Sequence, residues 1–432
     1  MADFVSLNQK ASSNSLDDAI WSCLSHVRVL DITNELGFMC GKMLADMGAD
    51  VIKVEQPTKK QSPSRNSLHR KTTDTEKKLY WFSYNAGKRC ITLNLKSQPG
   101  RDILRKLVGK SDIVIESFPP DTMQKWGLDF EDLQKINSKI IFTSITPFGR
   151  NGPYKNYKIS DVVALAMSGQ LFLTGDADRP PVQTGFPQTY LHGGAEACVA
   201  TLMALYHREI TGEGQLIDVS IQEALLGTTF NAIYTWITKQ VILQRMGPTR
   251  MVGRNLEMQL PWPCNDGFVS FSVLGGSSGG KTMRNLANWM EEEGMGNETI
   301  SNTDWGSFDF YGLTTEMITK VSEPIKHFFS QYTKDELFEE SIRREIMLFP
   351  VVNADSICKD PHLQAKGFWQ KMKGPYQDLN IDFPKSPIRI NDEYPYISRP
   401  SPLKGEHNIE VYKELLHFSD QELNNLRIRR VL

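Results

Sequence analysis

The chain has 432 residues, of which 40% are hydrophobic and 23% are charged, and its formal net charge is −2. This length allows two or three domains and a large buried core. The charge balance argues against nucleic acid as the main partner, because phosphate binding usually requires a strongly basic domain.

Membrane and secretory segments are not expected. No apolar run approaches the ~18–20 residues needed to cross a bilayer. The N-terminal stretch MADFVSLNQKASSNSLDD has no apolar region behind basic residues, so it does not resemble a secretory signal. The six cysteines are scattered without a C-x-x-C pair, as is typical of reduced proteins. The sequence therefore predicts a cytoplasmic globular protein.

The first half of the chain alternates between expected strands and helices. We expect strands at 27–31, 51–55, 91–95, 112–116 and 140–145, and helices at 37–47 and 99–108. This alternation predicts a parallel sheet covered by helices. Strands that are apolar on both faces belong in the middle of a doubly wound sheet.

Residues 57–78 are rich in Lys, Ser, Thr and Arg. Such a composition favours a solvated loop. The alternative is that some of its cations contact the phosphates of an anionic ligand.

The second half predicts a change of domain. Apolar residues at helical spacing mark a helix at 193–209, and 216–220 is another expected strand. Beyond about residue 225, the alternating Phe268, Ser270 and Ser272 and several amphipathic helices indicate a smaller α+β domain. We expect a large domain over 1–224, the smaller domain over 225–341, and a return of 342–432 onto the large domain.

The stretch from Gly275 to Thr282, GGSSGGKT, fits the phosphate-binding pattern G-x-x-x-x-G-K-[ST]. The preceding strand alternates between apolar and polar residues, whereas a phosphate-binding loop normally follows a strand buried on both faces. No later apolar strand ends in an aspartate that could hold a metal ion. A flexible glycine loop with another use is therefore preferred to nucleotide hydrolysis.

Single acidic and basic residues give no reaction by themselves. Asp161 at a helix start is first a capping candidate. His192 could be an acid or base, although a histidine at a helix start is more often structural. Glu196 could be an enclosed carboxylate. No Ser-His-Asp order, H-E-x-x-H motif or metal-ligand cluster is present, so the residues alone indicate an enzyme-like α/β scaffold without metal.

Several motifs in one order nevertheless resemble the class III CoA-transferases, a family that includes formyl-CoA transferase, the carnitine CoA-transferases and α-methylacyl-CoA racemase. The resemblance runs from Val27 to about Tyr412. The motifs are VLDIT at 29–33, GKMLADMGADVIKVE at 41–55, NAGKR at 85–89, ESFPP at 116–120, FGRNGPY at 148–154 and TGEGQLIDVS at 211–220.

The resemblance implies a Rossmann-like large domain built from both chain ends, a smaller domain, and a dimer of interlocked subunits. It implies a CoA thioester as substrate and no tightly bound cofactor. The implied CoA-binding positions are Asn34, Glu35, Leu36, Gly37, Lys88, Arg89, Ser117, Phe118 and Lys125. The glycine segment, with Gly275, Gly276, Gly279 and Gly280, becomes a candidate lid over the active site.

The chain departs from the family at the catalytic aspartate, whose position is occupied by Tyr190. The transfer mechanism needs a carboxylate that attacks the thioester, forms a mixed anhydride and then carries CoA as an enzyme thioester. A phenol does not provide this chemistry. The racemase is also disfavoured, since its proton-transfer pair would fall at Ser160 and Tyr190. No catalytic residue is therefore assigned in this chain.

Two explanations of this departure remain. The chain resembles the aspartate-less subunit of the two-subunit benzylsuccinate CoA-transferases of anaerobic aromatic degradation, at 176–182 and 190–196. This resemblance implies a heterodimer in which a paralogous subunit supplies the aspartate, and transfer from succinyl-CoA to an aryl- or alkyl-substituted succinate. Alternatively, a carboxylate such as Glu196 serves in a homodimer. A different class of function is a catalytically silent acyl-CoA-binding regulatory subunit.

Overall fold

A computed structural model describes residues 23–57, 74–252, 256–307, 314–374 and 380–432. The chain forms two compact units. The first unit is built from Met1–Gln170, Thr184–Tyr234 and His362–Leu432, and the second from Leu171–Gln183 and Thr235–Pro361. Each unit is described separately below.

The first unit is built around a six-stranded sheet with the order β3-β2-β1-β4-β5-β6, in which every neighbouring pair is parallel. The strands are β1 (Arg28–Asp31), β2 (Asp50–Glu55), β3 (Arg89–Thr92), β4 (Ile113–Glu116), β5 (Ile141–Thr146) and β6 (Leu216–Ser220). Its helices up to Tyr234 are α2 (Phe38–Asp46), α3 (Asp74–Asn85), α4 (Gln98–Val108), α5 (Thr122–Lys125), α6 (Phe130–Gln134), α7 (Asp161–Met167), α8 (Thr189–Thr211), α9 (Ile221–Leu226) and the first half of α10 (Phe230–Lys239), whose second half belongs to the second unit.

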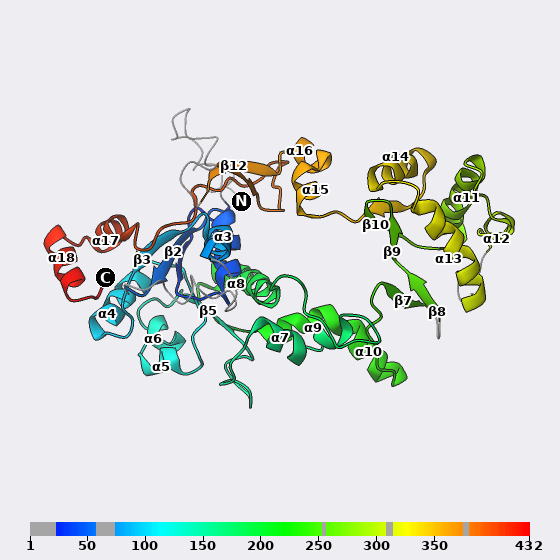
Figure 1. The fold of residues 1–432 in the computed structure, drawn as a ribbon. Coiled ribbons are helices and arrows are strands. Elements are labelled where there is room, and N and C mark those ends of the chain that lie inside the picture. Colours follow the sequence, from blue (N-terminus) through cyan, green and yellow to red (C-terminus); the bar gives the residue numbers. More distant parts are fainter. Residues whose placement is uncertain (1–22, 58–73, 253–255, 308–313, 375–379) are drawn as a thin grey trace. The chain divides into compact units, whose positions relative to one another are not determined.

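Helices cover both faces of this sheet (Figure 1). Apolar side chains of α2 and α8 pack on one face, in a cluster that includes Leu44, Ala197 and Val29. Side chains of α4 and the C-terminal helices pack on the other, in a cluster that includes Leu104 and Val411. Burial on both faces explains why the strands read as continuous apolar runs. The prediction of an α/β fold with a parallel sheet is confirmed.

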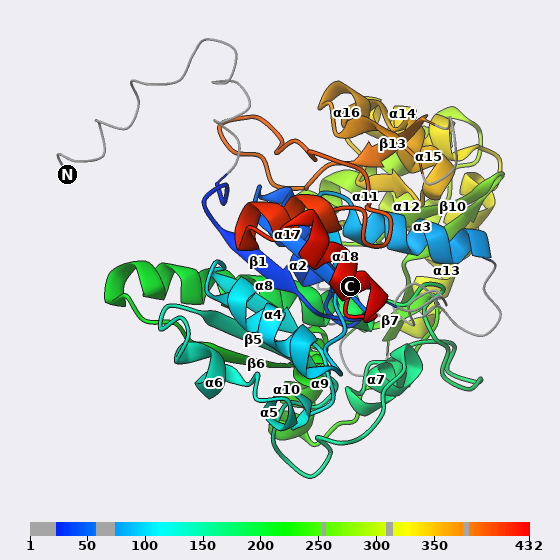
Figure 2. The same ribbon diagram turned by 90° about the vertical axis from the view of Figure 1, so that its left-hand side faces the viewer.

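The end of the chain returns to the edge of this sheet. It contains α16 (Pro361–Ala365), the hairpin of β12 (Trp369–Lys373) and β13 (Asn380–Pro384), α17 (Asn408–Leu416) and α18 (Asp420–Ile428). Figure 2 shows α17 and α18 beside α4. The polar groups of edge strand β3 are satisfied here: the Cys90 carbonyl accepts from His407 N at 3.0 Å, and Asn408 Oδ1 accepts from Thr92 N at 2.8 Å.

The second unit has an antiparallel sheet of order β11-β10-β9 and a separate β7–β8 pair. Its strands are β7 (Thr249–Val252), β8 (Leu256–Gln259), β9 (Pro261–Cys264), β10 (Gly267–Phe271) and β11 (Leu348–Pro350). Its helices are α11 (Gly276–Glu292), α12 (Glu298–Asn302), α13 (Thr315–Phe329), α14 (Lys334–Arg344) and α15 (Ala354–Lys359). Trp262, Trp289 and Trp305 are buried in its core. Along β10, Phe268 is exposed whereas Val269 and Phe271 are buried, the half-exposed pattern expected.

The loop expected at 57–78 is only partly within the described structure, because 58–73 lie outside it. From Asp74 the chain is helical, as α3. In the part of the chain that the structure describes, no helix combines the length and apolar character needed to span a bilayer.

Candidate functional site

In the sheet of the first unit, the direction in which successive strands are added reverses between β1 and β4. Two predicted CoA-binding residues meet at this point. The chain leaves β1 at Asp31 and β4 at Glu116, and the next loops carry Asn34 and Ser117. Asn34 N donates to Ser117 Oγ at 2.8 Å, and Ser117 Oγ donates to Asn34 Oδ1 at 2.8 Å. In open α/β sheets, ligands bind outside the carboxyl ends of strands at such a point.

A small crevice of about 160 Å³ opens at this place. Its lining residues are Ile32, Thr33, Asn34, Val54, Glu55, Gln56, Leu93, Leu95, Ser117 and Phe118. The ring of Phe118 packs edge-on against Trp126, with 5.2 Å between the ring centroids. The structure therefore brings Asn34, Ser117 and Phe118 together around one crevice. Its size suits one group of a ligand, since sites for whole drug-sized ligands measure about 300–1,000 Å³.

The three predicted CoA-binding cations lie in different surroundings. Lys88 is fully buried and its Nζ donates to Asp31 Oδ2, Asn85 Oδ1 and the Phe38 carbonyl, at 2.9, 3.0 and 3.1 Å. The Arg89 guanidinium is held by carboxylates, as described below. Lys125, on α5, is exposed. The side chains of Lys88 and Arg89 are thus occupied within the protein, and their contact with CoA stays a prediction.

Arg89 ties the C-terminal return to the sheet. Its guanidinium donates to both oxygens of Asp50, at 2.9 and 2.6 Å, and to Glu410 and Glu414 of α17, at 2.9 and 2.8 Å. Its side chain is only 7% exposed. These contacts describe a structural role that the sequence motif did not reveal.

Tyr190 lies on the first turn of α8 and is half-buried. Burial raises the pKa of its phenol, and the negative charges of Glu35 and Asp161 raise it further. Burial also raises the pKa of Glu35. The Glu35 carboxylate therefore acts electrostatically on Tyr190. Sequence reasoning named Glu35 only as a CoA contact, because nothing in its spacing reveals that its loop approaches α8.

Asp161 positions the start of α8. It is buried, and its Oδ1 accepts from Gln188 N at 3.0 Å, Thr189 N at 2.9 Å and Thr189 Oγ1 at 2.8 Å. The capping interpretation is correct in kind, although Asp161 is the first residue of α7 and supports the N-terminus of α8. Glycines let α8 approach α2 closely: a Cβ at Gly194 would lie 2.7 Å from Met39 Cβ and 3.0 Å from Cys40 N.

Glu196 and His192 are the two other candidates that the sequence offered on α8. Glu196 is exposed, on the same helical face as the exposed side chains of Val199 and Met203. An enclosed carboxylate was one of two interpretations of Glu196, and within this chain alone its side chain is not enclosed. His192 is half-buried.

The glycine segment belongs to the second unit and is helical. A flexible loop was expected at this glycine segment, but Gly276 to Gly280 form the first turns of helix α11, so that expectation is wrong. A Cβ at Gly280 would lie 2.7 Å from the Trp305 carbonyl oxygen, which shows close backbone packing. Lys281 pairs with Glu345, and Thr282 Oγ1 accepts from Met347 N at 3.3 Å. The phosphate-loop interpretation gains no support here, and the lid role stays a prediction.

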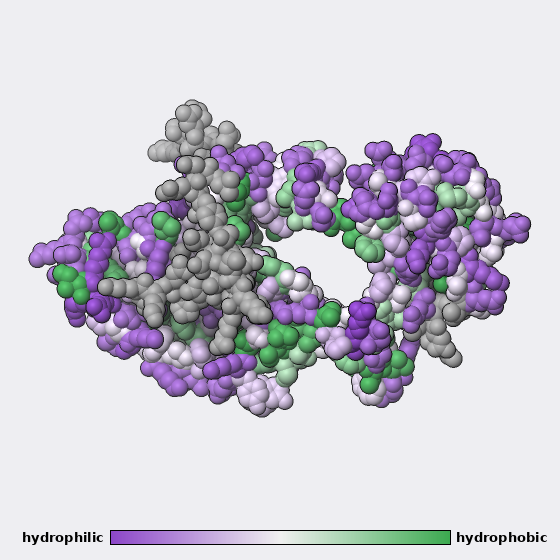
Figure 3. All heavy atoms as spheres, viewed as in Figure 1, coloured by the Kyte–Doolittle hydropathy of each residue, from purple (hydrophilic) through white to green (hydrophobic). Residues whose placement is uncertain are grey.

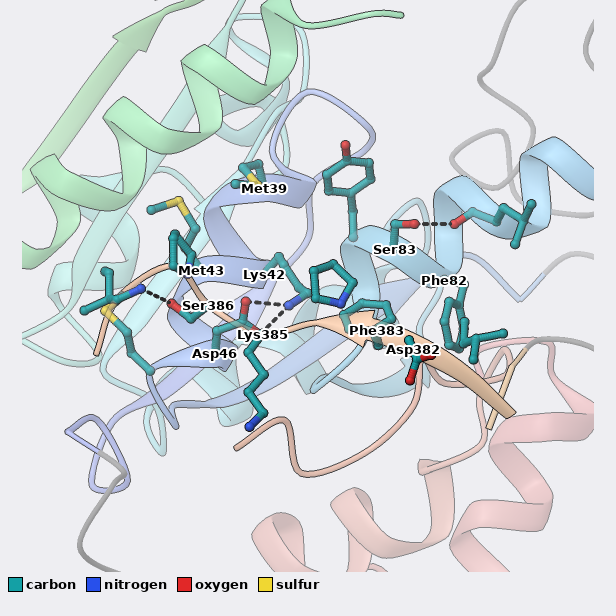
Figure 4. Close-up of a pocket in the computed structure, with 17 residues that line it drawn as sticks. Met39, Lys42, Met43, Asp46, Phe82, Ser83, Asp382, Phe383, Lys385 and Ser386 are labelled. Carbon is teal, nitrogen blue, oxygen red and sulfur yellow. Dashed lines mark hydrogen bonds and ion pairs between the residues drawn. The ribbon is translucent and has the colours of Figure 1, made fainter. Parts of the chain in front are cut away.

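A larger pocket of about 490 Å³ lies beside α2, α3 and β13 (Figure 4). Met39 and Met43 of α2, and Met47 directly after it, contribute apolar surface. Lys42 is buried, pairs with both carboxylate oxygens of Asp46, and lies 5.4 Å from the ring centroid of Phe383. No predicted site residue lines this pocket, so it is distinct from the crevice at β1 and β4.

Glu116 shapes the turn that carries Ser117 and Phe118. Its carboxylate accepts from Phe118 N at 2.7 Å, and burial raises its pKa to about 7, against the lowering effects of Ser144, Phe118 and Arg150. The folded protein therefore binds more protons than the unfolded chain between pH 4.5 and about 7. Stability falls as the pH rises through this window.

Replacing Glu116 with Gln should remove this pH penalty. Gln retains an oxygen acceptor for Phe118 N and carries no charge. We expect the free energy of unfolding to rise by about 2–3 kcal/mol at pH 8 and to change little at pH 5. Urea denaturation at both pH values measures this, with Glu131→Gln on the exposed surface of α6 as control. An equal effect at pH 5 and pH 8 would contradict the assignment.

The comparisons with known proteins identify the family of this scaffold. Residues 24–408 match the model of CoA-transferase family III, so the chain belongs to that family and is an enzyme of the class III CoA-transferase type. It is 31% identical to the succinyl-CoA:(R)-benzylsuccinate CoA-transferase subunit BbsE of Thauera aromatica, covering 90% of this chain and 93% of that protein.

Two further relatives agree with this assignment. The chain is 30% identical to the formyl-CoA:oxalate CoA-transferase of Streptomyces avermitilis, covering 95% of this chain and 99% of the relative. A crystal structure of a CAIB/BAIF family protein from Brucella suis has a TM-score of 0.73 and 25% identity, covering 90% of this chain and 98% of that one. Among the residues that the structure describes, no group of three or more His, Cys, Asp or Glu side chains could hold a metal ion.

Proposed function

We propose that this chain is the aspartate-less subunit of a heteromeric CoA-transferase. The complex transfers CoA from succinyl-CoA to an aryl- or alkyl-substituted succinate, such as benzylsuccinate. A paralogous partner, interlocked with this chain, supplies the nucleophilic aspartate. The observation that carries the proposal is the phenol of Tyr190 on the first turn of α8, where the family resemblance places the catalytic carboxylate.

The surroundings of Tyr190 support this proposal. Asp161 already accepts three hydrogen bonds at the start of α8, so its carboxylate is committed to structure. Within this chain, Glu196 lies on the exposed face of α8, together with Val199 and Met203. The chain resembles a protein named as one subunit of a benzylsuccinate CoA-transferase. This resemblance supports both the proposal that a second subunit supplies the aspartate and the proposed substrate.

Exposed apolar surface supports assembly with a second chain. Along α8, Val199, Met203, Tyr206 and Ile210 are 51–72% exposed at helical spacing. Figure 3 shows further hydrophobic surface over α7 and α9, where Val162 and Val163 are exposed. Contiguous apolar surface of this kind marks interaction sites in soluble proteins. We assign it to the paralogous subunit.

The test is a CoA-transfer assay from succinyl-CoA to benzylsuccinate. It compares this chain alone with this chain co-expressed with an aspartate-bearing paralogue from the same source. We expect transfer only by the mixture. Turnover by this chain alone would overturn the proposal, and binding of CoA without transfer by any mixture would indicate a regulatory subunit.

One observation favours a second candidate function. Glu35 and Asp161 are the carboxyl groups whose charges act on Tyr190, and burial raises the pKa of Glu35. If this chain alone turns over, Glu35 is the nucleophile to examine, rather than Glu196. Glu35→Gln would then abolish turnover, whereas Glu196→Gln would leave it within about twofold.

A further inference from the structure

The pocket beside α2, α3 and β13 is lined mainly by apolar side chains, and none of the predicted CoA-binding residues lines it (Figure 4). It is called the α2 pocket below. Met39, Met43 and Met47 form one wall, and Phe82 of α3 and Ile381 of β13 lie on the others. Its volume of about 490 Å³ falls within the range of about 300–1,000 Å³ that is usual for binding sites. An apolar surface of this kind marks a place where another group binds.

The charges of the α2 pocket are paired within the protein, with one exception. Lys42 pairs with both carboxylate oxygens of Asp46, and Asp382 pairs with Lys371 at 2.7 Å. Lys385 also lines the pocket, and its Nζ donates to a backbone carbonyl at 2.9 Å. Among the residues that the structure describes, no carboxylate pairs with Lys385. The α2 pocket therefore suits an apolar group with an acidic group close to it.

The described chain begins at the edge of the α2 pocket. Leu24 N donates to the Met47 carbonyl at 3.0 Å, and Leu24 is only 7% exposed. Met43 and Met47 pack against the apolar cluster that contains Leu24. Residues 1–22 lie outside the described structure. A chain that continues backward from Cys23 thus starts within two residues of a group that is bonded to the pocket wall.

The sequence before Cys23 has its apolar residues in the right place for this pocket. Residues 6–15, SLNQKASSNS, are mostly polar, whereas residues 16–21 are LDDAIW. A chain spans at most about 3.6 Å per residue, so Ile20 and Trp21 come within about 10 Å of Cys23. A tryptophan side chain buries about 150–250 Å² when it packs. The α2 pocket offers apolar surface for this burial within reach of the segment.

We propose that residues 16–22 dock into the α2 pocket of the same chain. Ile20 and Trp21 fill its apolar interior, and the two aspartates that precede them lie near Lys385. The methionines of the pocket wall suit this contact, because their flexible thioether side chains adapt to aromatic and aliphatic groups. This inference is independent of the proposed function, since it requires neither CoA nor a partner subunit.

A docked segment contacts three parts of the first unit that are distant in the sequence. Phe82 of α3 packs edge-on against Phe383 of β13, with 5.3 Å between the ring centroids. Lys42 of α2 lies 5.4 Å from the centroid of the same Phe383 ring. A segment in the pocket adds its own contacts to α2, α3 and β13. We therefore expect it to hold the C-terminal hairpin against the two helices.

The first experiment places a thiol in the pocket wall. Ser83 of α3 lines the pocket and is exposed within the described chain, so Ser83→Cys provides a thiol that the docked segment shields. The full chain with this substitution is treated with iodoacetamide, and mass spectrometry follows alkylation of the introduced thiol. Adding Ile20→Asp and Trp21→Asp should raise its alkylation rate at least about fivefold, because labelling follows the population of the open state.

Two controls accompany this measurement. Phe4→Asp with Val5→Asp adds the same charges to the same leader, farther from Cys23, and should leave the alkylation rate unchanged. Cys358, exposed on α15, should react at the same rate in every variant. An alkylation rate of the introduced thiol that Ile20→Asp and Trp21→Asp do not change overturns the inference. Shielding that weakens on dilution of the protein assigns the occupant to a second chain and also overturns it.

A reciprocal experiment leaves the leader intact and changes the pocket. Ser83→Trp should fill part of the α2 pocket with a large ring and displace the segment. Chymotryptic cleavage after Trp21, followed by mass spectrometry of the full chain, should then be at least about fivefold faster than in wild type. Equal cleavage rates in Ser83→Trp and wild type would show that the pocket does not protect Trp21, and would overturn the inference even if the aspartate variants failed to fold.

Discussion

Replacing the nucleophilic aspartate of the partner subunit with asparagine should lower the transfer rate of the complex at least about a thousandfold. Loss of the group that forms the covalent intermediate removes the only route through an anhydride, and losses of nucleophiles in other enzymes are of this size or larger. Steady-state transfer from succinyl-CoA to benzylsuccinate measures it. The amide should leave assembly unchanged, which size-exclusion chromatography checks.

The matched change in this chain is Glu196→Gln, on the exposed face of α8. It should leave the rate of the complex within about twofold, because the proposal places the nucleophile in the partner and gives Glu196 no catalytic role. A large loss from Glu196→Gln, together with full activity of the partner's amide variant, would place the nucleophile in this chain and contradict the proposal.

Arg89→Met should destabilise the first unit by about 3 kcal/mol. The substitution removes the guanidinium that bonds both Asp50 oxygens, although Asp50 keeps the Arg28 Nε bond at 2.7 Å, and removing one partner of a largely buried ion pair typically costs about 3–5 kcal/mol. The lower end applies because Glu410 and Glu414 remain about half exposed and can be hydrated. Urea denaturation, followed by tryptophan fluorescence, gives the change.

Lys125→Met separates stability from ligand binding. Lys125 is exposed on α5, so its loss should change the free energy of unfolding by less than about 0.5 kcal/mol. A rise in the KM for the CoA thioester in this variant would support its predicted contact. If Arg89→Met were as stable as wild type and raised that KM instead, Arg89 would be a ligand residue and its structural assignment would be wrong.

The fold was largely predictable because the strands are buried on both faces. Val29, Val51, Ile113 and Ile141 lie in continuous apolar runs, and such runs between helices indicate a parallel sheet. Helix α3 was missed, since its polar N-terminal turns continue the composition of the preceding loop. Its buried face, including Trp81 and Phe82, follows from tertiary contacts that composition does not show.

The candidate site was predictable only where neighbouring strands bring loops together. Asn34 and Ser117 follow adjacent strands and meet as expected of such an edge. The motif predicts that Lys88 and Arg89 bind the ligand. In the structure, however, both side chains form ion pairs with carboxylates that are distant in the sequence. The charged Asp31 and Lys53 inside apolar strands were the available signal for the buried ion pair that they form, because a charge in such a run requires a partner.

The covering of β3 by the C-terminal return has a consequence for synthesis of the chain. Cys90 and Thr92 obtain their partners from residues 407 and 408, more than three hundred positions later. Translation adds about 5–20 residues per second, so the nascent chain carries β3 without these partners for many seconds. An uncovered edge strand can pair with the edge of another chain. We therefore expect ribosome-bound intermediates to depend on chaperones until the last helix emerges, and C-terminal truncations to aggregate.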